Sequence, residues 1–426
     1  MTDLTIQQTD LARNPPASRG WIVTFAGTGI NLALGILYAW SVFKAAIAQD
    51  FGWDPTKLND PYAVCCLVFA FAMILAGRCQ DKFGPRVTAF IGGLLVSAGL
   101  LWVSTTTNYT VWVLGFGVLA GAGIGFGYSS ATPPALKWFG PAKTGLIAGL
   151  VVAGFGLAPV YIAPLSKYLV KHYDVVSAMR IYGIAFLIVV CGLSLLLVNP
   201  PSGYVPPNAG AKKKAGAAAV TATPSEMLRT PTFYLLWVMY FIGAGAGLMV
   251  ISSVNSMAGK SMGEWAHIAV AVLAIGNAGG RIIAGLLSDR IGRRWTLMTV
   301  LLFQAALMFI AIPVTGSAST PAVAIVLVAT CIGFNYGANL SLFPSFTKDL
   351  WGLRTFGMNY GFVFTAWGVG GFVLPRLQQM LQTRSGNYAS SFMTAGGLLL
   401  IGAALTFLLK PRQPKPIVAL SGSPGT

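Results

Sequence analysis

Apolar stretches of about 20 residues, each long enough to cross the hydrocarbon core of a bilayer as one α-helix, recur along the whole chain. Short polar segments separate them. We therefore predict an all-α integral membrane protein with twelve transmembrane helices. They are expected near residues 21–44, 61–80, 86–106, 111–132, 144–167, 178–198, 232–258, 266–287, 296–314, 321–345, 356–380 and 388–409.

The composition supports a chain that is dissolved in lipid rather than in water. Hydrophobic residues make up 55% of the 426 residues and charged residues only 9%, whereas a globular domain has about 25% charged residues. The formal net charge of +17 does not indicate binding to nucleic acid. The positive residues lie in short segments between apolar stretches, where they determine membrane topology.

The distribution of Lys and Arg predicts the side of the membrane that each segment occupies. Twelve helices place both termini on one side, and that side holds 19 of the 28 Lys and Arg residues, against eight, including Lys44, on the other. Positive residues accumulate in cytoplasmic segments. We therefore expect both termini to be cytoplasmic.

One long polar connection divides the chain. It covers residues 199–230, is rich in Pro, Gly, Ala and Lys, and is expected to be a flexible cytoplasmic linker whose basic run Lys212–Lys214 contacts anionic lipid. The predicted organisation is a tail (1–20), a six-helix half (21–198), this linker, a second six-helix half (231–410) and a tail (411–426).

Two segments repeat at one offset of 208 residues. Gly77, Asp81, Gly84 and Arg86 after the second helix recur as Gly285, Asp289, Gly292 and Arg294 after the eighth. The same offset relates Ile124-Gly-Phe-Gly-Tyr128 to Ile332-Gly-Phe-Asn-Tyr336. Two independent matches at one offset indicate that a six-helix half has been duplicated.

The repeated G-x-x-x-D-x-x-G-x-R pattern resembles the signature loop of the major facilitator superfamily. The resemblance extends over the whole chain and implies two pseudo-symmetric six-helix halves. It also implies that Asp81, Arg86, Asp289 and Arg294 act as conformational latches at the inner mouth. Ordinary topogenic charge is the alternative explanation, and it accounts better for Lys82 and Arg290 than for the paired aspartates.

Arg281 is a charge deep inside the eighth predicted helix. Such a charge costs at least about 2.5–3.5 kcal/mol on insertion scales. The alternative is that Arg281 reaches the near interface. Because this helix is predicted to run inward and side chains lean toward the helix N-terminus, we expect Arg281 to lean toward the midplane. Met73 occupies the equivalent position of the first half.

An anionic ligand is the expected partner of Arg281, because all eleven Asp and Glu residues fall in loops or at helix ends. A guanidinium fork binds a carboxylate in a bidentate pair. Structural packing is the competing explanation for the neighbours that we expect to complete a half-apolar binding site. These neighbours are Asn277, Tyr128, Tyr336, Tyr38, Leu37, Phe364 and Trp367.

Several further segments resemble the bacterial oxalate/formate antiporter family, which is related to the animal monocarboxylate transporters. They are Lys82-Phe-Gly-Pro-Arg86, Lys137-Trp-Phe, Glu226-Met-Leu-Arg-Thr-Pro231, Leu342-Phe-Pro-Ser345 and Asn359-Tyr-Gly-Phe362. The resemblance implies that Arg281 matches a substrate-binding Arg and that Tyr38 and Tyr128 match aromatic residues of the binding site. Tyr336 falls where the oxalate carrier has a Trp.

Two departures from these relatives bear on the substrate and on coupling. Trp367 stands where the oxalate carrier has a second cation, a Lys, so a monocarboxylate such as lactate or pyruvate is expected. Asn277 replaces an Asp of the animal transporters, which weakens the analogy for proton coupling. Proton symport remains the expected mechanism, because the resemblance includes lactate/proton carriers and the empty Arg281 needs charge compensation.

We therefore expect a functional monomer in the cytoplasmic membrane of a bacterium that carries a small organic anion together with H⁺. It is expected to be no enzyme and to need no cofactor or metal. Oxalate/formate-type anion exchange is one alternative. A membrane sensor or assembly partner without transport is another, although no large signalling domain is visible in the sequence.

Overall fold

The computed structural model describes residues 18–139, 144–204, 222–316, 320–352 and 355–409. Every regular element among these residues is helical, as the apolar pattern predicts. Most of the predicted tail 1–20, the tail 411–426 and the basic run Lys212–Lys214 lie outside the described residues.

The helices before the linker cover the first six predicted spans. A short 3-10 segment, η1, interrupts the first span, and a π-helical segment, η3, interrupts the fourth. The elements are α2 (Ser18–Leu34), η1 (Gly35–Ala39), α3 (Trp40–Asp50), η2 (Pro55–Lys57), α4 (Asp60–Val103), α5 (Tyr109–Trp112), η3 (Val113–Ala120), α6 (Gly121–Trp138), α7 (Thr144–His172) and α8 (Val175–Ser194).

The helices after the linker cover the remaining six spans. They are α9 (Pro224–Leu228), α10 (Pro231–Ile251), α11 (Val254–Met262), η5 (Gly263–Trp265), α12 (Ala266–Ile291), α13 (Arg293–Gly316), α14 (Ala322–Trp351), α15 (Phe356–Ser385), α16 (Ala389–Leu405) and η6 (Thr406–Leu408). The predicted span 232–258 is shorter in the structure. It breaks after Ile251, where the Ser252 hydroxyl donates to the Met249 carbonyl and competes with continued helical bonding.

Ten helical stretches of the described residues are long and apolar enough to cross a membrane. One of them, Pro55–Val103, contains both the second and the third predicted spans. The eleventh predicted span corresponds to α15. This helix has 30 residues and is long enough to cross a membrane, but it is not one of these ten apolar stretches. Large apolar side chains such as Phe25, Leu75 and Ile188 are more than half exposed, as expected for a lipid-facing surface.

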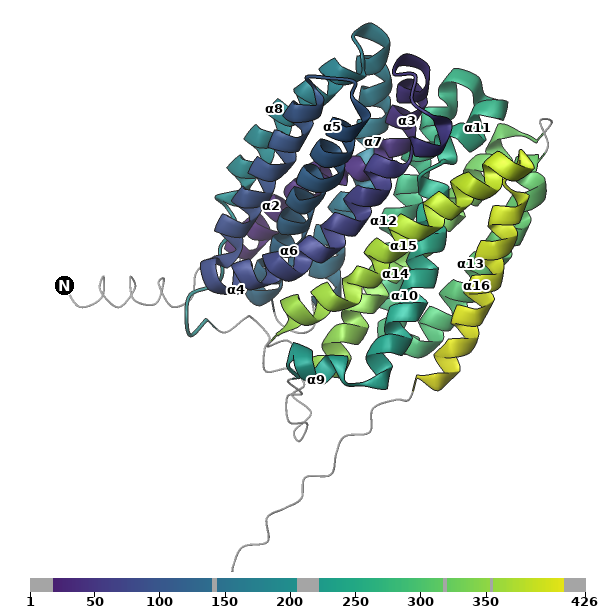
Figure 1. Cartoon of the computed structure of the whole chain (residues 1–426). Helices are drawn as coiled ribbons and strands as arrows, with labels where there is room; N and C mark the ends of the chain where they lie inside the picture. The colour runs from purple at the N-terminus through teal and green to yellow at the C-terminus, as the bar shows by residue number, and fades with distance from the viewer. Residues whose placement is uncertain (1–17, 140–143, 205–221, 317–319, 353–354, 410–426) are drawn as a thin grey trace, which may run out of the picture.

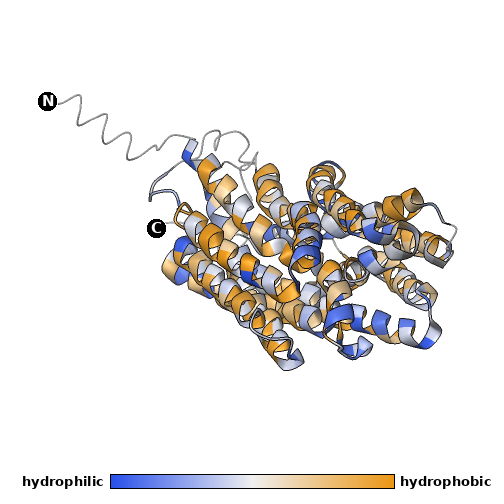
Figure 2. Cartoon of the chain, turned by 90° about the horizontal axis from the view of Figure 1, so that it is seen from above, coloured by the Kyte–Doolittle hydropathy of each residue, from blue (hydrophilic) through white to orange (hydrophobic). Residues whose placement is uncertain are grey.

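The helices form two groups that lie side by side. Figure 1 shows α2 to α8 in purple and blue beside α10 to α16 in green and yellow. The groups meet where α4 packs on α15 and α7 packs on α12. Figure 2 shows apolar residues along most of the helices, with hydrophilic residues scattered among them.

The two signature loops, residues 77–86 and 285–294, turn the chain at equivalent glycines. Gly84 kinks α4 with a φ of 82°, and Gly292 separates α12 from α13 with a φ of 90°. L-residues with a side chain rarely adopt such angles, whereas glycine does so at little cost. We call the end of the bundle that carries these loops the signature face, and the opposite end the far face.

Candidate functional site

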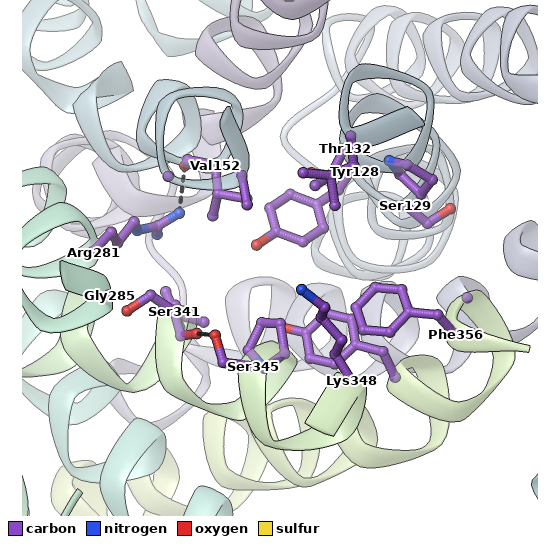
Figure 3. Close-up of a pocket in the computed structure, with 18 of the residues that line it drawn as sticks. Tyr128, Ser129, Thr132, Val152, Arg281, Gly285, Ser341, Ser345, Lys348 and Phe356 are labelled. Atoms are coloured by element: carbon purple, nitrogen blue, oxygen red, sulfur yellow. Dashed lines mark hydrogen bonds between the residues drawn. The ribbon is translucent and has the colours of Figure 1, made fainter. Parts of the chain in front are cut away.

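A cavity of about 170 Å³ lies between the two groups of helices. Its walls come from α4, α6, α7, α12, α14 and α15 and from Arg293 at the start of α13 (Figure 3). Tyr128, Met73 and Arg281 line its deep part, whereas Asp289 and Lys348 belong to the signature-face ends of α12 and α14. The cavity therefore extends from the middle of the bundle toward the signature face.

Arg281 is 1% exposed, and its guanidinium is only partly satisfied. Its Nε donates to Asn277 Oδ1 at 3.0 Å, and its Nη1 donates to the Val152 carbonyl at 2.5 Å. The buried Nη2 has no hydrogen-bond partner among the described residues. No carboxylate of the described residues forms an ion pair with Arg281. The guanidinium also interacts with the Tyr128 hydroxyl, and Nη2 keeps hydrogen-bond donors that no described residue uses.

Close helix approach holds Arg281 in place. A Cβ at Gly280 would overlap the Phe334 carbonyl of α14, and one at Gly337 would overlap the Asn277 carbonyl of α12. On the other side, a Cβ at Gly156 of α7 would lie 3.3 Å from the Arg281 Nε. The small residues that the sequence places here let α7, α12 and α14 clamp the Arg281 stem and its partner Asn277.

Three of the predicted site residues form a hydrogen-bonded aromatic cluster. The hydroxyls of Tyr38 and Tyr336 are 2.5 Å apart, and the Trp367 indole donates to the Tyr336 hydroxyl at 2.7 Å. All three side chains are at most 3% exposed. They join η1, α14 and α15 beside the cavity without lining it. Trp367 holds the Tyr336 hydroxyl through its indole N–H.

Further aromatic rings connect this cluster to Tyr128. Phe364 stacks on Trp367 at 4.9 Å between ring centroids and lies 5.8 Å from Tyr128. Phe69 and Phe155 complete the layer, at 5.4 Å and 5.3 Å from the Tyr128 ring. This buried aromatic layer gives the deep end of the site an apolar wall.

Sequence reasoning missed Phe69, Phe155 and the cavity-lining Lys348. A signal existed for Phe69, since the 208-residue offset makes it the equivalent of Asn277, just as Met73 is the equivalent of Arg281. Leu37 is fully buried in η1 and does not line the cavity. Of the predicted substrate-binding residues, Arg281 and Tyr128 alone are in the cavity wall (Figure 3).

The predicted latch residues differ in their contacts. Asp289 forms an ion pair with Arg293 at 2.7 Å, and Arg293 also bonds Asp349 at 3.1 Å. Arg294 instead donates to the Phe407 carbonyl at 3.2 Å. In the other signature loop, Asp81 and Arg86 are exposed and form no ion pair with a described residue.

The far face is closed by polar contacts between the two groups of helices. Arg376 of α15 forms an ion pair with Asp60 of α4 at 2.5 Å, and Tyr109 donates to the second Asp60 oxygen at 2.6 Å. Lys44, which we counted on the outer side at the end of the predicted span 21–44, is in α3 and is only 7% exposed. The reason is that α3 continues to Asp50 and Lys44 donates to Gln379 of α15 at 3.1 Å.

Membrane-length helices around a cavity that holds a buried cation and reaches one face are the architecture of a solute carrier. The sequence model of the Major Facilitator Superfamily matches residues 21–375 and again residues 259–425. The chain therefore belongs to the major facilitator superfamily of membrane transporters. This confirms the family predicted from the signature loops.

The chain is similar to several named members of this superfamily. It is 28% identical over 391 residues to the oxalate:formate antiporter of Oxalobacter formigenes, a match that covers 90% of this chain and 89% of that protein. It is 28% identical over 363 residues to the uncharacterized MFS-type transporter YhjX of Escherichia coli (strain K12), covering 82% and 85%. It is 26% identical over 410 residues to monocarboxylate transporter 13 of Bos taurus, covering 93% and 91%.

Proposed function

We propose that the chain is a secondary active transporter of a small monocarboxylate, of the lactate or pyruvate type, and that a proton accompanies the anion. The observation that carries this proposal is the buried Arg281 guanidinium, whose Nη2 has no partner among the described residues. An uncompensated buried charge is costly. A carboxylate that enters the cavity offsets this cost and accepts a charge-assisted hydrogen bond.

The surroundings of Arg281 favour a small anion with one carboxylate and an apolar body. The cavity volume of about 170 Å³ suits a solute of a few heavy atoms. Tyr128 offers a hydroxyl on the opposite wall, and the layer of Phe69, Phe155 and Phe364 lies behind it. Arg281 is the one charged residue among the described residues that line the deep part of the cavity, which supports one carboxylate at that depth.

Transport by alternating access follows from the two ends of the cavity. In this state the Asp60–Arg376 pair joins α4 to α15 at the far face, while the cavity extends toward the signature face. With both termini cytoplasmic, as the Lys and Arg distribution predicts, this state faces inward. Halves 21–198 and 231–410 then rock about Arg281, and Asp81, Arg86, Asp289 and Arg294 act as latches when the inner ends meet.

Proton coupling makes the proposed cycle electroneutral, because a monocarboxylate that moves with one proton transfers no net charge. The bacterial cytoplasmic membrane, with its proton gradient, is the proposed location. Proteoliposomes test this directly. Uptake of radiolabelled lactate is expected to rise when the outside is made acidic. A rate of uptake that does not change with the pH gradient, at a clamped membrane potential, would contradict proton symport. It would not contradict transport of the anion itself.

Anion exchange of the oxalate/formate type is the second candidate. The similarity to the oxalate:formate antiporter over 90% of this chain favours it. Exchange and symport differ in one measurement. An obligate exchanger takes up labelled anion only into proteoliposomes preloaded with formate or oxalate, whereas a proton symporter also takes it up into proteoliposomes that contain no anion substrate.

A further inference from the structure

Lys348 and Arg293 are further cations in the wall of the cavity that contains Arg281, and of these two Lys348 alone has no ion-pair partner among the described residues (Figure 3). Lys348 lies near the signature-face end of α14 and is half-buried. Ser341 and Ser345 line the same cavity from the same helix. Positions 341, 345 and 348 share one helical face because they are four and three residues apart. This polar face therefore extends from the depth of Arg281 toward the signature face.

The ammonium of Lys348 has no ion-pair partner among the described residues. The two neighbouring carboxylates are already engaged, because Arg293 binds Asp289 at 2.7 Å and Asp349 at 3.1 Å. Arg293 also donates to the Ser288 hydroxyl. A Lys ammonium has three donors and no acceptor. In this region Lys348 is thus a cation that is directed at the cavity and that no described carboxylate neutralises.

The direction of α14 brings Lys348 closer to Arg281 than its position in the chain indicates. Lys348 is seven residues after Ser341, which is about 10 Å along a helix axis at 1.5 Å per residue. Side chains lean toward the N-terminus of their helix. The N-terminus of α14 is on the far-face side, so the Lys348 side chain leans inward along the cavity. The two cations stand at successive depths of one path.

We propose that Lys348 forms a second carboxylate-binding site, at the signature-face mouth of the cavity. The site receives the substrate anion from Arg281 and exchanges it with water. This inference rests on the proposed function. An anion leaving the buried Arg281 would otherwise lose all its charge-assisted contacts at once. A second cation on the path replaces part of that interaction, and in the reverse direction it attracts anions to the mouth.

The test compares Lys348→Gln with Arg290→Gln in vesicles of known orientation. Arg290 is exposed on the same face and does not line the cavity, so its replacement removes the same charge without touching the path. Initial rates of labelled lactate uptake are measured in inside-out and in right-side-out membrane vesicles. Lys348→Arg, which keeps the charge, provides a second variant if Lys348→Gln is poorly inserted.

Lys348→Gln is expected to raise the apparent KM about tenfold in inside-out vesicles, the effect of one lost charge-assisted contact. The KM in right-side-out vesicles stays within about twofold, and Lys348→Arg and Arg290→Gln behave like the wild type. An unchanged KM for Lys348→Gln overturns the site. Equal effects of Lys348→Gln and Arg290→Gln overturn it as well, since they indicate surface potential alone. Failure of the wild type to transport any monocarboxylate refutes the proposed function instead.

Discussion

Asp60 and Arg376 form an ion pair across the interface between α4 and α15, with 2.5 Å between Arg376 Nη2 and Asp60 Oδ1. The Asp60 side chain is 10% exposed and that of Arg376 is 42% exposed. Tyr109 donates to the second oxygen of Asp60. Arg376 also lies 4.6 Å from the centre of the Phe372 ring. This network joins helices of the two groups at the far face, opposite the end toward which the cavity extends.

Replacing Asp60 by Asn is expected to open the far face more often, because it removes the charge that holds Arg376. Cys66 reports on this opening. It is fully buried in α4, and a Cβ at Gly371 of α15 would lie only 2.9 Å from the Cys66 Cβ. In a chain whose other cysteines are replaced by Ala, a membrane-impermeant maleimide should label Cys66 several-fold faster in Asp60→Asn.

The matched control for this experiment is Asp54→Asn. Asp54 is an exposed carboxylate that caps η2 through Thr56 and forms no ion pair with a described residue. Its replacement should leave the labelling rate unchanged. Equal labelling of Cys66 in Asp60→Asn and in the parent would show that the ion pair does not restrain the far face.

Gly84 and Gly292 should tolerate no side chain, for a reason that concerns the backbone alone. A Cβ added to either glycine would meet no heavy atom within 4 Å, but both residues have a positive φ. Both residues combine a positive φ with an extended ψ of 172° and 150°, a region essentially limited to glycine where another residue costs about 1–3 kcal/mol. Gly84→Ala and Gly292→Ala are expected to lower the thermal unfolding midpoint in detergent. A Cβ added to Gly279 would also meet no heavy atom within 4 Å, and Gly279 has no positive φ. Gly279→Ala should therefore be neutral or slightly stabilising.

Tyr336 links Tyr38 to Trp367, so its hydroxyl is expected to contribute more to the stability of the fold than a hydroxyl on the protein surface does. Tyr336→Phe leaves the buried Tyr38 hydroxyl and the Trp367 indole without their partner. An unsatisfied buried donor costs about 1–3 kcal/mol. A lower midpoint of thermal unfolding is the expected result. An unchanged midpoint would indicate that both groups find other partners. Tyr182→Phe is the reference variant, because it removes a buried hydrogen bond to Ser166 away from the site.

Features that depend on local pattern could be predicted from the sequence. Apolar stretches of membrane length predicted the helices, and the repeated glycines predicted two turns that the structure shows at Gly84 and Gly292. Arg281 could be singled out because a charge is rare in a long apolar stretch. Its isolation from carboxylates followed from the absence of acidic residues within the predicted spans.

Features that depend on contacts between distant segments could not be predicted in this way. Asp60 and Arg376 are 316 residues apart and each resembled an ordinary charge at a helix end. Lys348 resembled a topogenic residue, because its position in the cavity wall depends on how α14 faces α6 and α12. The burial of Lys44 at the outer end of the first predicted span could not be predicted for the same reason, since its partner Gln379 belongs to α15.

The central claim is that Arg281 binds the carboxylate of the transported anion, and the most direct test is lactate uptake by purified Arg281 variants in proteoliposomes. Loss of a bidentate charge-assisted pair is expected to lower uptake at least about 100-fold in Arg281→Ala. Arg281→Lys, which keeps the charge without the fork, should recover only part of the activity. The thermal unfolding midpoints of the variants and the wild type should be comparable, so that a difference in uptake does not result from unfolding. Lactate uptake by Arg281→Ala at the wild-type rate would contradict the account.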